Sequence, residues 1–159
     1  MFINMDVNGM KIRDYEDSDK QRLLEIYDTA IPLAHDFLDK SIRDQERRIC
    51  EEFFDRDDSQ TFVLEIDGEV VGFSTIKNET KMASFFIDPQ FQRKRLGTEL
   101  MKSIQKNKQT IELAVYERNR KALSFYRKNG FEVIDQARRN PKDRKSLKYL
   151  VMKWEVQNN

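Results

Sequence analysis

One segment near the middle of the chain constrains the fold more than any other, because a strand, a helix and a second strand follow one another between residues 81 and 116. The run KMASFFID is mostly apolar and is stopped by Pro89, which predicts a strand over 81–88. TIELAVY, 110–116, alternates like a second strand. Between them, apolar residues recur at helical spacing: Leu96, Leu100, Met101 and Ile104. A strand–helix–strand unit of this kind predicts two parallel strands joined by a right-handed crossover.

The rest of the N-terminal half predicts two helices and three further strands. MKIRDY, from Met10, predicts the first strand, and TFVLEIDGEVVGFSTIK predicts two strands joined at Asp67-Gly68, a strong hairpin signal. Asp17-Ser18-Asp19 supplies capping residues for a first helix that Pro32 should end or kink. Ser41 resembles the start of a second helix.

The C-terminal part predicts one more helix and two strands. Asn119 caps a helix that Gly130 ends, and the runs FEVIDQAR and SLKYLVMKW predict strands. The whole order, β-α-α-β-β-β-α-β-α-β-β, predicts a single α/β domain over residues 10–159, with a mixed sheet (α+β in its antiparallel parts) and about four flanking helices. Residues 1–9 are expected to be an N-terminal extension that can be disordered. A predicted edge strand near 147–154 could pair with a second copy, so we expect a monomer or a homodimer.

Composition excludes several classes of function. The chain of 159 residues has a net charge of +1, so we expect no nucleic-acid partner and no anionic membrane. Its one cysteine, Cys50, allows neither a disulfide framework nor a zinc-ligand pattern, and we expect a buried thiol and no metal. No apolar run approaches the roughly 20 residues that span a bilayer, which favours a cytoplasmic protein.

The stretch FQRKRLGTEL, 91–100, joins the strand ending before Pro89 to the next helix. Free N–H groups and the dipole at the start of a helix favour anions, especially phosphate. Gly97 permits close approach of the main chain, and Thr98 can donate a hydroxyl hydrogen bond. Basic residues add positive charge here: Arg93, Lys94 and Arg95. From these residues alone, a phosphate-binding turn and the charged start of an ordinary surface helix both remain open.

A second motif lies in NRKALSFYRKNGF. Asn119 and Tyr126 are seven residues apart, close to two helical turns, so both lie on one face of the predicted helix. A phenol at this place could protonate a leaving group. The alternative is that Tyr126 only packs in the core and Asn119 only caps its helix.

Together the two motifs resemble those of the GNAT superfamily of N-acetyltransferases, and the resemblance spans roughly residues 10–155. The first family motif, Gln/Arg-x-x-Gly-x-Gly/Ala, here runs from Gln92 to Gly97. The second is intact, with Asn119 followed by Ala122, Phe125-Tyr126 and Gly130-Phe131. PLAHDFLDK, 32–40, is similar to small bacterial members with an Ala-His-x-Phe segment, some of which act on protein lysines or peptide amines.

The resemblance implies a GNAT-like acyl-CoA N-acyltransferase fold with splayed parallel strands and acetyl-CoA as acetyl donor. Phe86 and Ile87 should offer main-chain hydrogen bonds to the acetyl carbonyl and the pantetheine arm. The turn should bind the diphosphate, and Asn119 the pantetheine arm. Tyr126 should protonate the leaving thiolate as a general acid. The full set of residues implied for the cofactor is Phe86, Ile87, Gln92, Arg93, Lys94, Arg95, Leu96, Gly97, Thr98, Asn119, Ala122 and Lys128.

The chain departs from the family at Arg95, where glycine is usual. If this residue needs a positive φ, a side chain there costs on the order of 1 kcal/mol or more. If its φ is negative, Arg95 is harmless and can reach a phosphate oxygen. The sequence leaves both cases open.

The resemblance also implies that the acceptor is a small-molecule amine, a peptide or a protein lysine, which attacks the thioester directly. Such an amine, with pKa near 10.4, must first lose a proton, so a base or a water chain is needed. His35, the only histidine, is the candidate base or acceptor-side residue, with a purely structural histidine as the alternative. Tyr116 and Glu117 are further candidates for lining the acceptor side.

Two other classes of function compete with the enzyme. A catalytically inactive acetyl-CoA-binding module could use the same pocket, and Arg95 leaves this open. Nucleic-acid binding through the basic turn and RRNPKDRK, 138–145, is disfavoured by the balanced net charge.

Overall fold

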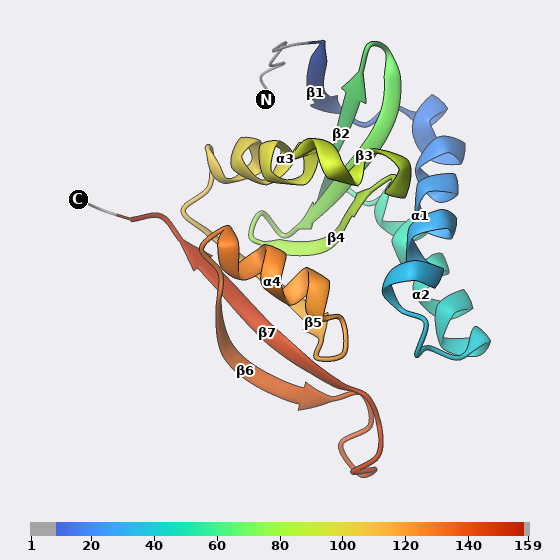
Figure 1. Ribbon diagram of the computed structural model, residues 1–159, viewed down its shortest axis with the longest axis vertical. Coiled ribbons are helices and arrows are strands. Elements are labelled where there is room, and N and C mark those ends of the chain that lie inside the picture. Colours follow the sequence, from blue (N-terminus) through green and yellow to red (C-terminus); the bar gives the residue numbers. More distant parts are fainter. Residues whose placement is uncertain (1–8, 158–159) are drawn as a thin grey trace.

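The fold is a seven-stranded mixed sheet with helices on its faces, seen in a computed structural model of the chain (Figure 1). The structure describes residues 9–157, with residues 92–94 described by their main chain alone, so residues 1–8 of the expected extension lie outside it. The strands, in the sheet order β1-β2-β3-β4-β5-β7-β6, are β1 (Met10–Asp14), β2 (Ser59–Ile66), β3 (Glu69–Lys77), β4 (Lys81–Ile87), β5 (Thr110–Tyr116), β7 (Lys148–Glu155) and β6 (Glu132–Arg138). The helices are α1 (Lys20–Ala34), α2 (Lys40–Phe53), α3 (Leu96–Gln105) and α4 (Arg120–Lys128), with short 3-10 turns η1 (Asp17–Asp19) and η2 (Pro89–Lys94). The predicted element order and α/β class are confirmed.

The parallel pair predicted around residues 81–116 is β4 and β5, joined by α3. Every other neighbouring pair is antiparallel. The β4–β5 ladder is very short, with only Lys81 opposite Glu112 and Met82 opposite Leu113. Beyond these pairs the ladder ends and the two strands diverge, which confirms the splayed parallel strands. We call the unpaired interval between β4 and β5, toward their carboxyl ends, the gap.

The turn between β2 and β3 has the predicted hairpin chemistry. Asp67 has φ 49° and Gly68 has φ 83°, so both central residues take the positive φ of the turns that match strand twist. Gly130, with φ 90°, follows the end of α4 in the same left-handed region and ends that helix as predicted.

The start of the first helix is as predicted, and the start of the second differs from the prediction by two residues. Asp19, one of the predicted capping residues, is the N-cap residue of α1 and forms a capping box with Glu16 around the preceding turn η1. Asp39, not Ser41, caps α2, with its carboxylate accepting the N–H of Ile42. Several capping residues lie within two positions of each other here, and composition alone does not choose among them.

Two core clusters lie on opposite faces of the sheet. The cluster on the side of α3 and α4 includes Leu100, Met101, Leu123, Phe131 and Met152. The cluster on the side of α1 and α2 includes Leu23, Ile26, Cys50, Phe54 and Phe73. The expected buried thiol is thus confirmed, and its burial raises the pKa of Cys50 to about 12.

The prediction of an edge strand at 147–154 was wrong. β7 lies between β5 and β6, and the edges of the sheet are β1 and β6. Its position near the chain end suggested an edge, but β6 folds back onto its outer side through the antiparallel β6–β7 hairpin. Among the described helices, none is both long and apolar enough to cross a membrane.

Candidate active site

Alternate residues of β4 direct their main-chain N–H and C=O groups toward the gap between β4 and β5. The Asp88 N–H donates to the Val71 carbonyl over 2.7 Å, and this bond sets the alternation along the antiparallel β3–β4 ladder. Phe86, two residues earlier, therefore also directs its N–H and C=O groups to β3. Phe85 and Ile87 direct theirs to the opposite side, toward β5 and beyond the last β4–β5 pair.

This register corrects one expected site residue. Of the two residues expected to bond the cofactor through their main chain, Ile87 faces the gap and Phe86 does not. Phe85, which was not among the expected residues, faces the gap as well, because a shift of one residue in a strand exchanges the two directions. The side chain of Phe86 instead packs against Tyr27 of α1, with ring centroids 5.1 Å apart.

The turn after β4 leads directly into the start of α3. η2 occupies Pro89–Lys94, and the first helical bond of α3 runs from the Glu99 N–H to the Arg95 carbonyl over 3.2 Å. The N–H groups of Leu96, Gly97 and Thr98 precede that bond, so they belong to the helix start that favours anions. The side chains of Gln92, Arg93 and Lys94 lie outside the described residues.

The structure gives the sign of φ at Arg95, which the sequence left open. It has φ 59° and ψ 20°, the left-handed conformation for which glycine is suited. Its side chain is exposed and makes no capping hydrogen bond to α3. The chain therefore carries at this turn a strain that the usual family glycine avoids.

An ion pair supports the beginning of the same turn. Asp88 is buried and caps η2, its carboxylate accepting the Gln90 N–H over 3.0 Å. Arg22 of α1 donates to the other carboxylate oxygen over 2.7 Å and to the Val70 carbonyl over 2.9 Å. The start of the turn is thus anchored to α1, which no local sequence signal indicated.

Gly97 serves a packing purpose at this place. A Cβ atom there would lie 3.2 Å from the nearest ring carbon of Phe125 and 3.7 Å from Ile87. The glycine therefore lets the start of α3 lie directly on Phe125 of α4. Its close approach to a phosphate stays a prediction.

Asn119 connects the start of α4 with the loop after α1. Its Oδ1 accepts the Ala122 N–H over 3.2 Å as the helix cap, and its Nδ2 lies 3.0 Å from His35 Nε2. Because the cap uses the oxygen, the amide nitrogen must be the donor to His35. Ala122, expected to contact the cofactor, thus has its N–H already engaged.

His35 is held neutral in this arrangement. Its Nε2 accepts from Asn119, so the ring proton of the neutral form sits on Nδ1, which is buried and has no hydrogen-bond partner among the described residues. Burial lowers the pKa of His35 to about 4. With one nitrogen engaged and the other protonated, His35 is poorly suited to be the general base that the sequence suggested.

Tyr126 lies among aromatic rings beside the gap. Its ring centroid is 6.5 Å from Phe85, 5.6 Å from Phe125 and 5.7 Å from Phe131. Burial raises the pKa of the phenol, so the hydroxyl keeps its proton at neutral pH. No hydrogen bond of this hydroxyl is found among the described residues, so its proton is not committed to any of their groups.

Tyr116 ends β5 within a cluster that sequence reasoning only partly found. Its ring packs edge-on against His35 (5.3 Å) and Phe37 (5.5 Å). Its hydroxyl donates a short hydrogen bond to Glu46 of α2, which together with burial raises the pKa of Tyr116 to about 12. Arg139 joins the cluster, donating to Tyr116 and Glu46. Glu46 and Arg139 lie 93 positions apart in the chain, and no motif linked them to Tyr116.

Two other expected residues form no contact with this cluster among those found. Glu117 is exposed and pairs with Lys148 over 3.2 Å. Lys128 is exposed in the last turn of α4.

The residues present fit a coenzyme A arm. β4 directs the main-chain groups of Phe85 into the gap, beyond the last pair of the β4–β5 ladder, and the start of α3 follows β4 after a single turn. A polar strand edge leading to an anion-favouring helix start matches a pantetheine amide chain that ends in a diphosphate.

Comparison with known proteins agrees with this geometry. Residues 19–156 match the family described as "Acetyltransferase (GNAT) domain". The peptidyl-lysine N-acetyltransferase YiaC of Escherichia coli K12 is 28% identical over 146 residues, which cover 91% of this chain and 97% of YiaC. The solution structure of apo YjaB from Escherichia coli has a TM-score of 0.76 at 23% identity and covers 91% of this chain and 97% of that one. PaiA N-acetyltransferase from Thermoplasma acidophilum, solved in complex with coenzyme A, has a TM-score of 0.73 at 19% identity. The match covers 92% of this chain and 99% of that one.

The chain belongs to the GNAT family of acetyltransferases. It is an N-acetyltransferase with acetyl-CoA as donor, as predicted from the two motifs. Within residues 9–157 the structure shows no group of three or more His, Cys, Asp and Glu side chains that could hold a metal ion.

Proposed function

We propose that this enzyme acetylates the side-chain amine of lysine residues in peptides or proteins. The sequence had left small-molecule amines, peptides and protein lysines open. YiaC, which matches nearly the full length of this chain, is a peptidyl-lysine N-acetyltransferase, and this supports the lysine acceptor.

The observation that carries the chemistry is the position of Tyr126 beside the splayed strands. Its ring contacts Phe85, whose main-chain groups face the β4–β5 gap. When bound, acetyl-CoA supplies a thioester whose C–S bond breaks as the amine forms the new N–C bond. Tyr126 holds the proton for the departing sulfur, and its raised pKa keeps that proton in place until a thiolate forms.

The main chain of β4 provides the complementary electrostatic contribution. A preorganised N–H directed at a developing oxyanion contributes more than the same group in water, because it needs no reorganisation. Phe85 directs its main-chain groups to the gap, so we propose that its N–H group polarises the acetyl carbonyl.

The acceptor side has a different arrangement from the one first expected. We propose that His35 acts as a positioning residue, holding the Nδ2 side of Asn119, rather than as the base. Glu46 is the carboxylate of this side, hydrogen-bonded by Tyr116 and only 24% exposed, and it can attract the lysine ammonium. The ammonium then passes its proton to water before the neutral amine attacks.

Tyr126→Phe tests the proposal, with Tyr15→Phe as the matched control on the far side of the sheet. We expect Tyr126→Phe to bind acetyl-CoA like the parent in calorimetric titration and to lose about 100-fold or more in kcat on a lysine peptide. Tyr15→Phe should retain the parent's kcat. Unchanged turnover by Tyr126→Phe would exclude it as the general acid.

The same experiment separates the enzyme from the alternative binding module. Binding of acetyl-CoA by the parent and by Tyr126→Phe, with no turnover by the parent on any amine, would favour the module.

We also retain as proposals a cytoplasmic location and a monomer or homodimer. The unpaired, buried Cys50 is consistent with a reducing compartment, and β6 rather than β7 offers the strand edge for a second copy.

A further inference from the structure

The connection between β6 and β7 is strongly basic, although the chain as a whole is nearly neutral. Its basic residues, with those at the adjoining strand ends, are Arg138, Arg139, Lys142, Arg144, Lys145 and Lys148. Asp143 is the only acidic residue among 138–148. We call residues 138–148 the basic loop.

Three of these basic side chains already form ion pairs or hydrogen bonds within the protein. Arg139 donates to Gln45 over 2.8 Å and lies 3.4 Å from Glu46, and Lys148 pairs with Glu117. Arg138 donates to the Ser146 carbonyl over 2.9 Å. These contacts secure the base of the loop against α2 and β5.

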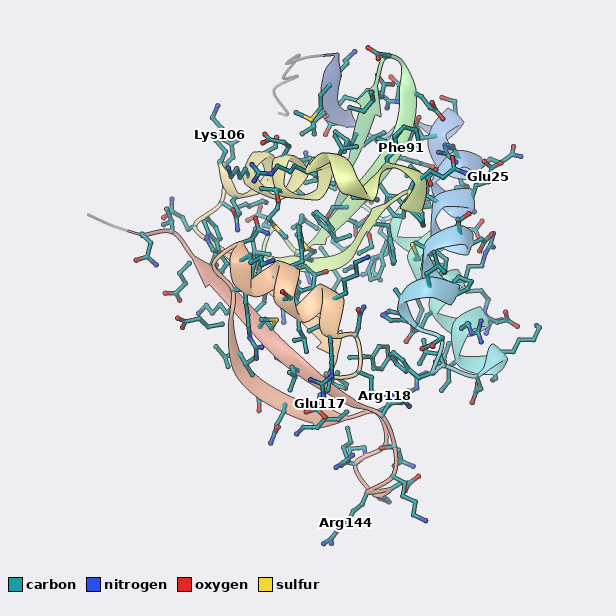
Figure 2. All side chains as sticks on the ribbon, in the orientation of Figure 1. Glu25, Phe91, Lys106, Glu117, Arg118 and Arg144 are labelled. Carbon is teal, nitrogen blue, oxygen red and sulfur yellow. The ribbon has the colours of Figure 1, made fainter. Side chains whose placement is uncertain are left out.

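The remaining cations are exposed and have no acidic partner among the described residues. They are Lys142, Arg144 and Lys145. The carboxylate of Asp143 accepts the Lys145 main-chain N–H over 2.9 Å, which shapes the turn and leaves the ammonium group itself without an ion pair. Figure 2 shows Arg144 extending from the tip of the loop, away from the body of the protein. An unneutralised cluster of this kind costs stability through self-repulsion and is available to an anionic partner.

The loop base lies at the acceptor side of the site. Arg139 contacts the hydroxyl of Tyr116, whose ring packs on His35, at the carboxyl end of β5 where the gap opens. Arg118 adds a further exposed cation on the same side, with its guanidinium 5.0 Å from the Phe37 ring centroid (Figure 2). A peptide that presents a lysine to the gap therefore passes close to these cations.

We propose that the basic loop binds acidic residues that flank the acceptor lysine, so that the enzyme prefers lysines in acidic segments. This inference rests on the proposed lysine acetylation. An extended peptide advances about 3.3–3.6 Å per residue, so acidic residues three to five positions from the lysine lie roughly 10–18 Å from it. That reach matches a loop that begins at the site and extends outward. Glu46 has the opposite charge, so it attracts the lysine ammonium while the basic loop attracts the acidic residues on either side of that lysine.

Charge complementarity favours an acidic polypeptide over a nucleic acid as partner. A nucleic-acid surface commonly covers a domain of high net positive charge, whereas here the net charge is only +1. A short acidic segment needs only a few such cations.

The test compares two peptides with one central lysine, one with aspartate at three to five positions on both sides and one with asparagine at the same positions. The enzymes are the parent, a loop variant (Lys142→Gln, Arg144→Gln, Lys145→Gln) and a charge-matched control (Lys81→Gln, Lys106→Gln, Lys108→Gln). The control lysines lie at the opposite end of the sheet, and Figure 2 shows Lys106 far from the loop. Both variants change the net charge equally.

We expect the parent and the control to show about tenfold higher kcat/KM for the aspartate peptide at 50 mM salt, and the loop variant to show about equal values. The preference of the parent should shrink at 300 mM salt, because the cations are exposed and screened. The loop variant should keep the parent's kcat/KM on the asparagine peptide.

Three results would overturn the inference. Equal acetylation of both peptides by the parent would refute the proposed role of the basic loop, while the proposed lysine acetylation would still stand. Equal loss of preference in the control would show a bulk charge effect. Tight salt-sensitive binding of a single-stranded RNA that competes with neither peptide would assign the loop to nucleic acid. Acetylation of neither peptide by the parent would instead refute the proposed function itself.

Discussion

Replacing Arg95 by glycine is expected to stabilise the protein, because the turn before α3 holds this residue at φ 59° and ψ 20°. For a residue with a Cβ, this left-handed conformation costs about 1–2 kcal/mol. Glycine removes that cost but gains about 0.4–1 kcal/mol of conformational entropy in the unfolded chain. The Arg95 side chain is exposed and makes no capping hydrogen bond, so its removal loses little. The free energy of unfolding should therefore rise by about 0.5–1 kcal/mol.

Urea denaturation measures this change directly. We expect a higher midpoint at an unchanged m-value, and a rise in Tm of about 1–4 °C for a domain of this size. Arg95→Ala is the control, since it removes the guanidinium but keeps the Cβ, and its stability should stay within about 0.3 kcal/mol of the parent. Equal stabilisation by alanine, or destabilisation by glycine, would show that backbone strain at this turn is not the cause.

Three further predictions follow from the contacts around the site. The pKa of His35 is lowered to about 4 in the folded protein, so the unfolded chain binds more protons below pH 6.5. The free energy of unfolding should therefore fall by roughly 2–3 kcal/mol between pH 6.5 and pH 4. In urea titrations across that range, His35→Gln should not show this pH-dependent loss of stability. Asn119→Ala loses the α4 cap and should cost about 0.5–2 kcal/mol, whereas Asn119→Asp, which keeps the capping oxygen, should cost less; equal losses would exclude the cap as the cause. Arg22→Gln leaves the buried Asp88 without its cation and should cost about 1.5–3 kcal/mol in the same assay; adding Asp88→Asn should recover part of that loss, and strictly additive costs would contradict the pairing.

The sequence carried most of the fold in local patterns. The alternation of TIELAVY, the helical spacing after Pro89 and the Asp67-Gly68 turn each depend on neighbouring residues, and each was confirmed. These signals are readable because period and turn chemistry act over a few residues. Errors arose where the choice was not local, as at the helix start assigned to Ser41 instead of Asp39, and at β7, which lies inside the sheet because β6 pairs on its outer side.

The features of the candidate site are likewise of two kinds, those that local sequence determines and those that depend on tertiary contacts. The sequence by itself determined the family motifs, the turn before α3 and the pairing of Asn119 with Tyr126 on one helix. Only the tertiary structure decided the sign of φ at Arg95, the direction of the Phe86 main chain, and the neutral state of His35. Each of these depends on which groups from distant parts of the chain lie within a few ångströms, and hydrogen bonds and desolvation act only over such distances. Contacts of this kind exist only once the sheet has brought β5, α2 and the basic loop together.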